Sequence, residues 1–251
     1  LKQAVLSPDA AGSAGRLLQG PLTAMGELVN FEAWRDAKRQ QEAQEVALAA
    51  SSPQAFPPGF AYTDDQNKAL HLLAGPARHT MLYGGARSGK TFLLVTAIVA
   101  RALKANGSRH AIFRHRFNHL KVSIGLDTLP SVMTKRFPGV KYHIDKSDWV
   151  VRIGDSEIWL GGLDEKERTE KILGQEYASL YYNECSQIAY SSVLMARTRL
   201  AQKTTLINRA YYDCNPPGSK HWTALVFVGK KDPSSKPAGA ALPNPENYDA
   251  L

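Results

Sequence analysis

The chain has 251 residues, 43% of them apolar and 22% charged, and its 31 Lys and Arg against 23 Asp and Glu give a net charge of +8. This composition is near the globular average, and no run approaches the ~18 uncharged apolar residues that span a bilayer, so general disorder and membrane insertion are excluded. The positive charge favours polyanionic partners, either nucleic acid or nucleotides. Cys185 and Cys214 are the only cysteines. They are too few for a disulfide framework and lack zinc-site spacing, which favours a reducing, intracellular setting, and residues 1–3 begin no export signal.

The first 58 residues predict an N-terminal helical extension and linker. Residues 31–50 are rich in good helix formers, and the Pro-rich residues 51–58 end that helix. The main domain is expected over residues 59–228. Thr63 and Gln66 have the spacing of a capping box, which predicts a helix over residues 64–74.

After this helix, β-type runs alternate with helical segments. The runs cover residues 79–83, 110–114, 149–153, 157–160, 179–182 and 205–212. Residues 91–105 are apolar on nearly every face, as expected of a helix buried against a sheet. The alternation predicts an α/β domain with a mostly parallel central sheet flanked by helices, and a turn at residues 153–157 predicts one antiparallel hairpin. Pro, Ser and Lys dominate residues 229–251, which predicts a loop or linker, or the start of a lid segment.

The strongest motif lies between a β-run and an apolar helix and matches the P-loop pattern in full. It consists of Gly84, Gly85, Ala86, Arg87, Ser88, Gly89, Lys90 and Thr91. In such a loop, backbone N–H groups surround phosphate oxygens, Lys90 would reach the β- and γ-phosphates of ATP, and the Thr91 hydroxyl would ligate Mg²⁺. The alternative is a glycine turn that has this pattern by chance.

Asn183 and Glu184 directly follow an apolar run at residues 177–182. A P-loop ATPase needs a strand-end carboxylate to polarise the attacking water, and Glu184 is the candidate general base. Asn183 stands where an Asp would hold the water shell of the metal. It brings no negative charge, so a weaker Mg²⁺ affinity is expected. The alternative is a surface Glu at the end of a strand.

Charge is segregated along the chain. Residues 66–126 contain ten Lys or Arg and no acid, which predicts a positive surface, and Arg114, Arg116 and Lys121 are candidates for contact with DNA. The alternative is that these bases only solvate exposed faces. No nuclease-type carboxylate cluster and no Gly-x-Ser-x-Gly motif are present, and the scattered histidines have no metal-ligand pattern.

The phosphate loop GGARSGKT, the strand end LYYNE and the later segment TTLINRAYYDCNPPGSKHW occur in an order and spacing that resemble the ATPase domain of large terminase subunits. These are the motors that package DNA into the heads of tailed bacteriophages. The resemblance covers roughly residues 60–250. It implies a RecA-like P-loop fold. It also implies a C-terminal nuclease domain, for which this chain leaves no room, so no nuclease activity is expected of it.

The resemblance also implies roles for four further residues. Gln66 would read adenine, although it could only complete the capping box. Asn215 would sense the γ-phosphate and couple hydrolysis to movement, although it could only form a turn. An arginine would stabilise the transition state, either Arg87 from within the loop or Arg168 from a neighbouring subunit.

The resemblance implies an ATP- and Mg²⁺-dependent motor that translocates double-stranded DNA. Its expected partners are a portal protein, a small terminase subunit and further copies in a ring, at the procapsid portal in the host cytoplasm. Two alternatives remain. One is a helicase-like or repair ATPase acting on nucleic acid, and the other is a nucleotide-binding scaffold without turnover, which Asn183 suggests and Glu184 argues against.

Overall fold

The structure is a computed structural model that describes residues 62–164, 170, 172–235 and 239–251. The helix expected at residues 31–50, the linker after it and Arg168 lie outside the described residues. The strands are β1 (His79–Tyr83), β2 (Arg109–Arg114), β3 (His143–Asp145), β4 (Val150–Ile153), β5 (Ser156–Gly162), β6 (Ser179–Tyr182), β7 (Arg209–Cys214), β8 (Lys231–Asp232), β9 (Ala240–Ala241) and β10 (Tyr248–Ala250). The helices are α2 (Asp64–Ala74), α3 (Lys90–Lys104), α4 (Phe117–Leu120), the π-helix η1 (Lys121–Thr128), α5 (Leu129–Arg136), η2 (Cys185–Gln187), α7 (Tyr190–Arg197), η3 (Ala224–Val228) and η4 (Pro245–Asn247).

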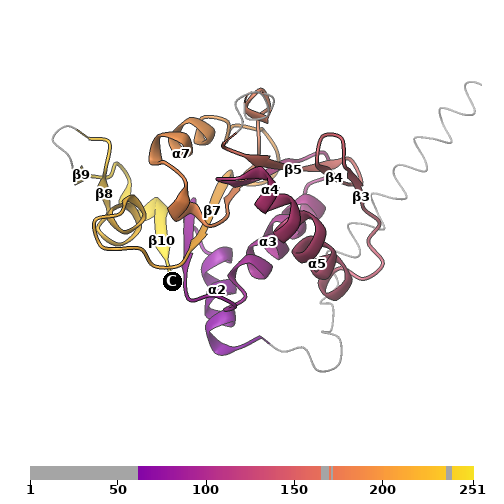
Figure 1. Cartoon of the computed structure of the whole chain (residues 1–251), viewed down its shortest axis with the longest axis horizontal. Helices are drawn as coiled ribbons and strands as arrows, with labels where there is room; N and C mark the ends of the chain where they lie inside the picture. Colours follow the sequence, from indigo (N-terminus) through magenta and orange to yellow (C-terminus); the bar gives the residue numbers. More distant parts are fainter. Residues whose placement is uncertain (1–61, 165–169, 171, 236–238) are drawn as a thin grey trace, which may run out of the picture. The chain divides into compact units, whose positions relative to one another are not determined.

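The core element is an eight-stranded sheet in the order β10-β1-β7-β6-β2-β5-β4-β3, with helices on both faces (Figure 1). All pairs from β10 to β5 are parallel. The pairs β5/β4 and β4/β3 are antiparallel. The predicted α/β fold with a mostly parallel sheet is confirmed, and so is the hairpin at residues 153–157. Because parallel strands end at one edge of a sheet, the segments that follow β1, β2, β6 and β7 lie along the same edge.

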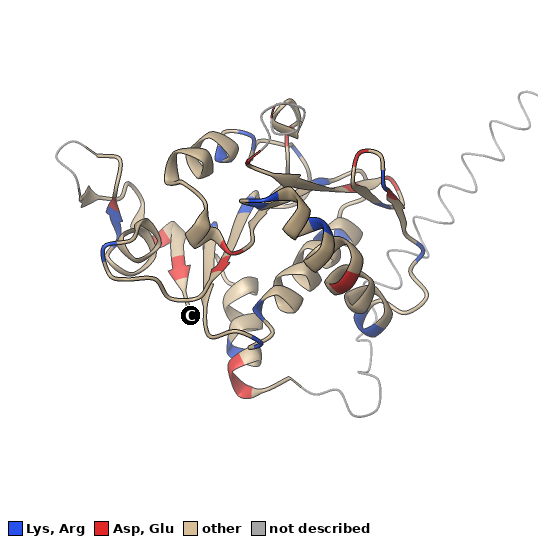
Figure 2. Ribbon diagram, in the orientation of Figure 1, with Lys and Arg blue, Asp and Glu red and all other residues tan. Residues whose placement is uncertain are grey.

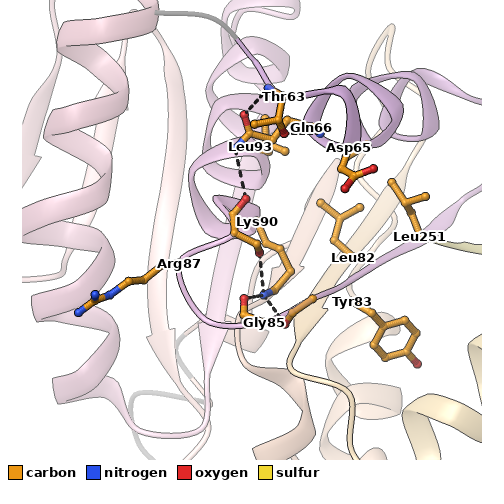
Figure 3. Close-up of a pocket in the computed structure, with 13 residues that line it drawn as sticks. Thr63, Asp65, Gln66, Leu82, Tyr83, Gly85, Arg87, Lys90, Leu93 and Leu251 are labelled. Carbon is orange, nitrogen blue, oxygen red and sulfur yellow. Dashed lines mark hydrogen bonds between the residues drawn. The ribbon is translucent and has the colours of Figure 1, made fainter.

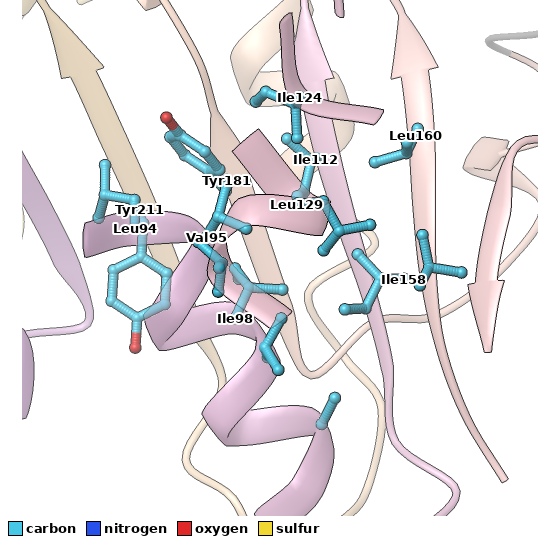
Figure 4. Close-up of a cluster of buried hydrophobic side chains, with 14 of the residues drawn as sticks. Leu94, Val95, Ile98, Ile112, Ile124, Leu129, Ile158, Leu160, Tyr181 and Tyr211 are labelled. Carbon is cyan, nitrogen blue, oxygen red and sulfur yellow. The ribbon is translucent and has the colours of Figure 1, made fainter. Parts of the chain in front are cut away.

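Side chains of the central strands alternate between two apolar layers, as the period of a strand requires. On one face, Tyr181 and Tyr211 pack with the buried side of α3 (Figure 4). Leu82 belongs to the same cluster of buried side chains. On the other face, Met81 and Tyr182 pack with side chains of α7 and η3. Helix α3 has eight buried residues among its fifteen, so it lies between the sheet and the helices α2 and α5. This burial holds the N-terminus of α3 against the carboxyl end of β1.

Helix α2 forms for a local reason. Both bonds of the capping box between Thr63 and Gln66 are present, and the helix ends at Gly75, as predicted.

Three parts of the chain differ from the sequence-based expectation. Strand β7 begins at Arg209, four residues later than residue 205, and no strand was expected at β3. The expected loop at residues 229–251 contains short strands, since β8 and β9 pair with each other and Tyr248–Ala250 pairs with the outer side of β1. The Tyr248 ring stacks on His79 at 4.5 Å, so the edge of β1 and a packing contact order a three-residue strand that has no periodic signal of its own.

Among the described helices, none combines the length and apolar character needed to cross a membrane.

Candidate active site

The loop between β1 and α3 has the geometry of an anion-binding cradle. Gly89 has a φ of +87°, a left-handed conformation that favours glycine, and a Cβ there would lie 2.6 Å from Gln66 Nε2. Lys90 Nζ donates hydrogen bonds to the carbonyl oxygens of Gly84 (2.7 Å) and Gly85 (2.8 Å). The ammonium group therefore lies inside the curl of the loop, next to the N-terminus of a fifteen-residue helix.

A pocket of about 560 Å³ adjoins this loop and is lined by residues of α2, β1 and α3 that include Gln66, Tyr83 and Lys90 (Figure 3). The Gln66 amide does more than complete the capping box, because its Nε2 donates to the carbonyl oxygen of Ser88 at 3.2 Å. Gln66 thus links the start of α2 to the phosphate loop. Arg87 is exposed, and Figure 3 shows its side chain directed away from Lys90.

Asn183 and Glu184 follow β6 at the same edge of the sheet. Asn183 is buried, with 2% of its surface exposed. Glu184 has left-handed backbone torsion angles, φ 49° and ψ 46°, which are uncommon for a residue with a side chain. After this turn, the Glu184 carboxylate reaches Arg114 at the end of the neighbouring strand β2.

Asp213, on β7, has no role in the sequence-based site, yet it lies at its centre. The register pairs it with Leu82 of β1, so β7 runs between the P-loop strand and β6. Asp213 Oδ1 accepts hydrogen bonds from the Tyr181 hydroxyl (3.0 Å), Asn183 Nδ2 (3.1 Å) and the backbone N–H of Glu184 (3.0 Å). Asp213 Oδ2 lies 3.4 Å from the Thr91 hydroxyl.

Burial raises the pKa of Asp213, and the donors from Glu184, Asn183 and Tyr181 lower it in turn. The sequence holds a signal for this residue besides the Asn-Pro turn that follows it. Asp213 lies near the end of a largely apolar run, two residues before Asn215. Its carboxylate therefore comes near a strand end, as that of Glu184 does.

Glu184 also forms an ion pair with Arg114 at the end of β2. Arg114 is 12% exposed, and it donates a second bond to Ser123 Oγ at 2.9 Å. Gln187 Nε2 donates to the same Glu184 oxygen, Oε2, at 3.2 Å. Among the described residues, the side-chain hydrogen bonds to the candidate general base therefore both go to Oε2.

The family described as "Terminase large subunit, T4likevirus-type, N-terminal" matches residues 81–250, more than half of the chain. The chain belongs to the large terminase subunits. Solved structures agree in fold. The large terminase of a thermophilic bacteriophage superposes with a TM-score of 0.62 at 18% identity, over 76% of this chain and 45% of that one. A structure of the same phage terminase in complex with ADP gives 0.58, also at 18% identity, over 76% of this chain and 45% of that one.

The HK97 bacteriophage large terminase gives a TM-score of 0.53 at 12% identity, over 74% of this chain and 40% of that one. This terminase chain thus spans less than half the length of these relatives. No curated protein matches it.

The residues of this terminase chain fit Mg²⁺, which prefers oxygen ligands and is commonly held by one or two carboxylates, waters and substrate phosphates. Thr91 and Asp213 offer a hydroxyl and a carboxylate oxygen. Asn183 Oδ1 is buried and has no hydrogen-bond partner. Among the described residues, no group of three or more His, Cys, Asp or Glu could hold a metal alone. The donor set therefore suits a cation that nucleotide phosphates help to bind.

The His-Trp pair after β7 anchors the segment that follows Glu184. His221 Nδ1 accepts from the backbone N–H of Thr223 (3.2 Å), which leaves the proton on Nε2 to donate to the Ser186 carbonyl oxygen (3.1 Å). Trp222 Nε1 donates to the carbonyl oxygen of Ile188 at 2.9 Å. Asn215, which precedes this pair, is exposed at the same edge of the sheet.

The three bases expected to contact DNA have different surroundings. Arg114 is engaged by Glu184. Lys121 lies 4.9 Å from the centre of the Trp149 ring, and Arg116 is exposed just before α4. The DNA-binding prediction remains a prediction, and only Arg116 and Lys121 are outside the candidate catalytic contacts.

Proposed function

We propose that this terminase chain binds ATP with Mg²⁺, hydrolyses it, and uses the free energy to translocate double-stranded DNA into a procapsid. The observation that carries this proposal is the convergence at one sheet edge of Lys90 within its loop, Thr91, and Glu184 at the end of β6. The complex of the thermophilic phage terminase with ADP supports nucleotide binding within the same fold.

The loop residues would bind the phosphates. Backbone N–H groups of residues 84–91 and the N-terminus of α3 would surround the phosphate oxygens, and Lys90 would exchange its carbonyl partners for the β- and γ-phosphates. Gln66, which already contacts Ser88, would read the adenine from the α2 side of the pocket. Bound Mg²⁺ would neutralise charge on the phosphates during transfer, with Thr91 as ligand and Asn183 reached through water.

Glu184 would act as the general base. Arg114 and Gln187 both bind its Oε2, so the carboxylate is oriented and Oε1 is left to accept the proton of the attacking water. Arg87 or Arg168 would stabilise the negative charge of the transition state, and the Arg87 side chain would have to turn toward Lys90 to do so. Asn215 would sense the γ-phosphate from the end of β7.

In the assembled motor we propose double-stranded DNA, a portal protein and a small terminase subunit as partners, with several copies of the chain forming a ring. The site of action would be the procapsid portal in the host cytoplasm. We place the boundaries of the motor domain at residues 59–228, with the Tyr248–Ala250 strand added to its sheet.

The test is Lys90→Ala. Loss of the ammonium from the loop should abolish nucleotide binding or reduce it below detection, as measured by calorimetric titration with ADP and by phosphate release from ATP. The matched control is Lys104→Ala, since Lys104 is exposed at the far end of the same helix.

Turnover of the Lys90→Ala variant at the parent rate would refute the site. A parent chain that binds nucleotide with Mg²⁺ but never releases phosphate, even with DNA, would instead favour a scaffold. Strand displacement activity would favour a helicase.

A further inference from the structure

Asn183 brings no negative charge to the proposed Mg²⁺ site. The residue at the strand end beside the metal site has an amide where an acid is expected, yet a carboxylate lies one strand away. Asp213 Oδ1 and Asn183 Nδ2 are 3.1 Å apart, and the same amide lies 3.5 Å from the Thr91 hydroxyl. The pair thus contains one acid and one amide, with the acid on β7 and not at the end of β6.

The two carboxylate oxygens of Asp213 have different hydrogen-bond partners. Oδ1 accepts from Tyr181, Asn183 and the Glu184 backbone, and three donors on one oxygen indicate the ionised form, which only accepts. Oδ2 accepts a hydrogen bond from the Thr91 hydroxyl at 3.4 Å. This side of the carboxylate therefore faces the hydroxyl that a P-loop uses to bind its cation.

The burial of Asp213 indicates that this charge has a counterion. Only 3% of the residue is exposed, and within the described part of the chain no Lys or Arg forms an ion pair with it. The charge of Lys90 acts on it, but from beyond ion-pair distance. An ionised carboxylate out of water without a cation is costly. Asn183 Oδ1 is also buried there, and among the described residues it has no hydrogen-bond partner.

We propose that Asp213 supplies the negative charge of the Mg²⁺ site, and that Asn183 acts as the donor that orients it. Asp213 is a positioning residue, because it would act on the cation through Thr91 and the water shell. The inference rests on the proposed Mg²⁺–nucleotide function and deepens it. The weaker Mg²⁺ affinity that Asn183 led us to expect is then no longer expected, because Asp213 on β7 supplies the negative charge that Asn183 lacks.

The test compares four proteins: the parent, Asp213→Asn, Asn183→Asp, and the double variant that exchanges the two residues. ADP affinity is measured by calorimetric titration with Mg²⁺ and again with a chelator, and Mn²⁺ binding to the ADP complex is followed by electron paramagnetic resonance. Asp213→Asn should reduce the gain in affinity from Mg²⁺ by roughly 10–100-fold, the usual effect of losing an outer partner of a metal, and leave the affinity in chelator unchanged. The exchanged double variant should recover most of the gain, because it again has one acid and one amide.

Asn183→Asp is the second decisive variant. It would set two carboxylates at the present 3.1 Å separation, where like charges cannot both ionise, so no tighter Mg²⁺ binding is expected. Thermal melting verifies folding. If Asp213→Asn does not fold, the double variant and Asn183→Asp decide the matter.

A full Mg²⁺ gain in Asp213→Asn, no recovery in a folded double variant, or clearly tighter Mg²⁺ binding in Asn183→Asp would each overturn the inference. The proposed function fails separately, when the parent itself binds no nucleotide.

Discussion

Glu184 shows how single residues are constrained at this site. Its left-handed conformation costs of order 1–3 kcal/mol for a residue with a side chain, and the surrounding structure has to hold it. The backbone N–H of Glu184 donates to Asp213, and its carbonyl oxygen accepts from Gln187 at 3.0 Å. Backbone strain, orientation by Arg114 and the backbone bond to Asp213 occur together at Glu184, as expected of a catalytic residue and not of a solvated strand end.

Replacing Glu184 by Gln should leave nucleotide binding intact and reduce turnover by roughly 10²–10⁴-fold, the usual contribution of a general base. The amide keeps the size of the side chain and loses only its ability to take a proton. ADP titration and steady-state phosphate release measure the two effects, and Glu246→Gln, at an exposed position of η4, is the control. If binding and turnover are lost together, Glu184 is structural.

At the scale of elements, the two strands that carry the site are tied together after their ends. The segment after β7 returns across the segment after β6, where His221 and Trp222 bind the carbonyl oxygens of Ser186 and Ile188. These bonds hold the residues that follow Glu184. His221 and Trp222 thus stabilise the segment that follows strand β6 and Glu184.

Trp222→Phe should lower the free energy of unfolding by about 1–3 kcal/mol, since it leaves the buried carbonyl of Ile188 without its donor, and it should also lower the turnover number. Trp159→Phe is a matched control. Both tryptophans are 9% exposed, and Trp159 Nε1 likewise donates one bond, to Glu157 at 3.1 Å, but on β5. Denaturant unfolding and phosphate release are measured for both. Equal loss of turnover in the two variants would contradict a role for the Trp222 contact in holding the base.

At the scale of the whole described domain, the bases of residues 66–126 come from several elements. Strands β1 and β2 are separated by β7 and β6, and Figure 2 shows Lys and Arg spread over many elements. Arg101 and Arg109 use their guanidinium groups in internal bonds, the first to Ser179 at 2.6 Å and the second to Gln175. A path for DNA must therefore be sought among exposed bases at the carboxyl edge.

The variant Arg116→Ala with Lys121→Ala should weaken DNA binding and flatten its salt dependence, while basal ATP turnover stays unchanged. The log–log slope should fall by about 0.9 for each phosphate that the variant no longer neutralises. Arg114 is left intact because it binds Glu184. Binding is measured by salt titration in the assembled motor. The control is the pair Lys104→Ala and Lys203→Ala, two exposed lysines near the opposite edge. If the salt slope is unchanged, Arg116 and Lys121 do not contact DNA and another part of the protein does.

Two buried histidines predict sensitivity to acid. The pKa of His110 is lowered to about 3 by burial and by Arg101, and that of His79 to about 3 by burial and by Arg197 and Arg78. Below the unfolded pKa of about 6.5 the unfolded chain binds protons that the native chain does not. Each histidine therefore contributes stability that is complete above about pH 6.5 and is lost by ~1.4 kcal/mol per pH unit as the pH falls toward 3.

Denaturant unfolding between pH 5 and pH 7.5 measures this loss. His110→Gln should reduce the slope of the unfolding free energy with pH by about one proton. His119→Gln, at an exposed position, should leave it unchanged. The same slope in the parent and in His110→Gln would show that His110 is protonated in the native state.

The sequence alone determined the features that depend on local patterns. The P-loop is contiguous in sequence and needs glycine where φ is positive, so its residues and the strand and helix beside it could be predicted. The capping box of α2 and the alternation that gives a parallel sheet could be predicted for the same reason. Motif order was enough to indicate the terminase family.

Only the tertiary structure decided which side chains from different strands meet. Asp213 reaches Asn183 and Thr91 because β7 lies between β1 and β6, and Arg114 reaches Glu184 because β2 lies beside β6. Tyr248–Ala250 becomes a strand because the outer edge of β1 offers it a partner. Strand order and register are contacts between residues distant in sequence, and no local propensity encodes them.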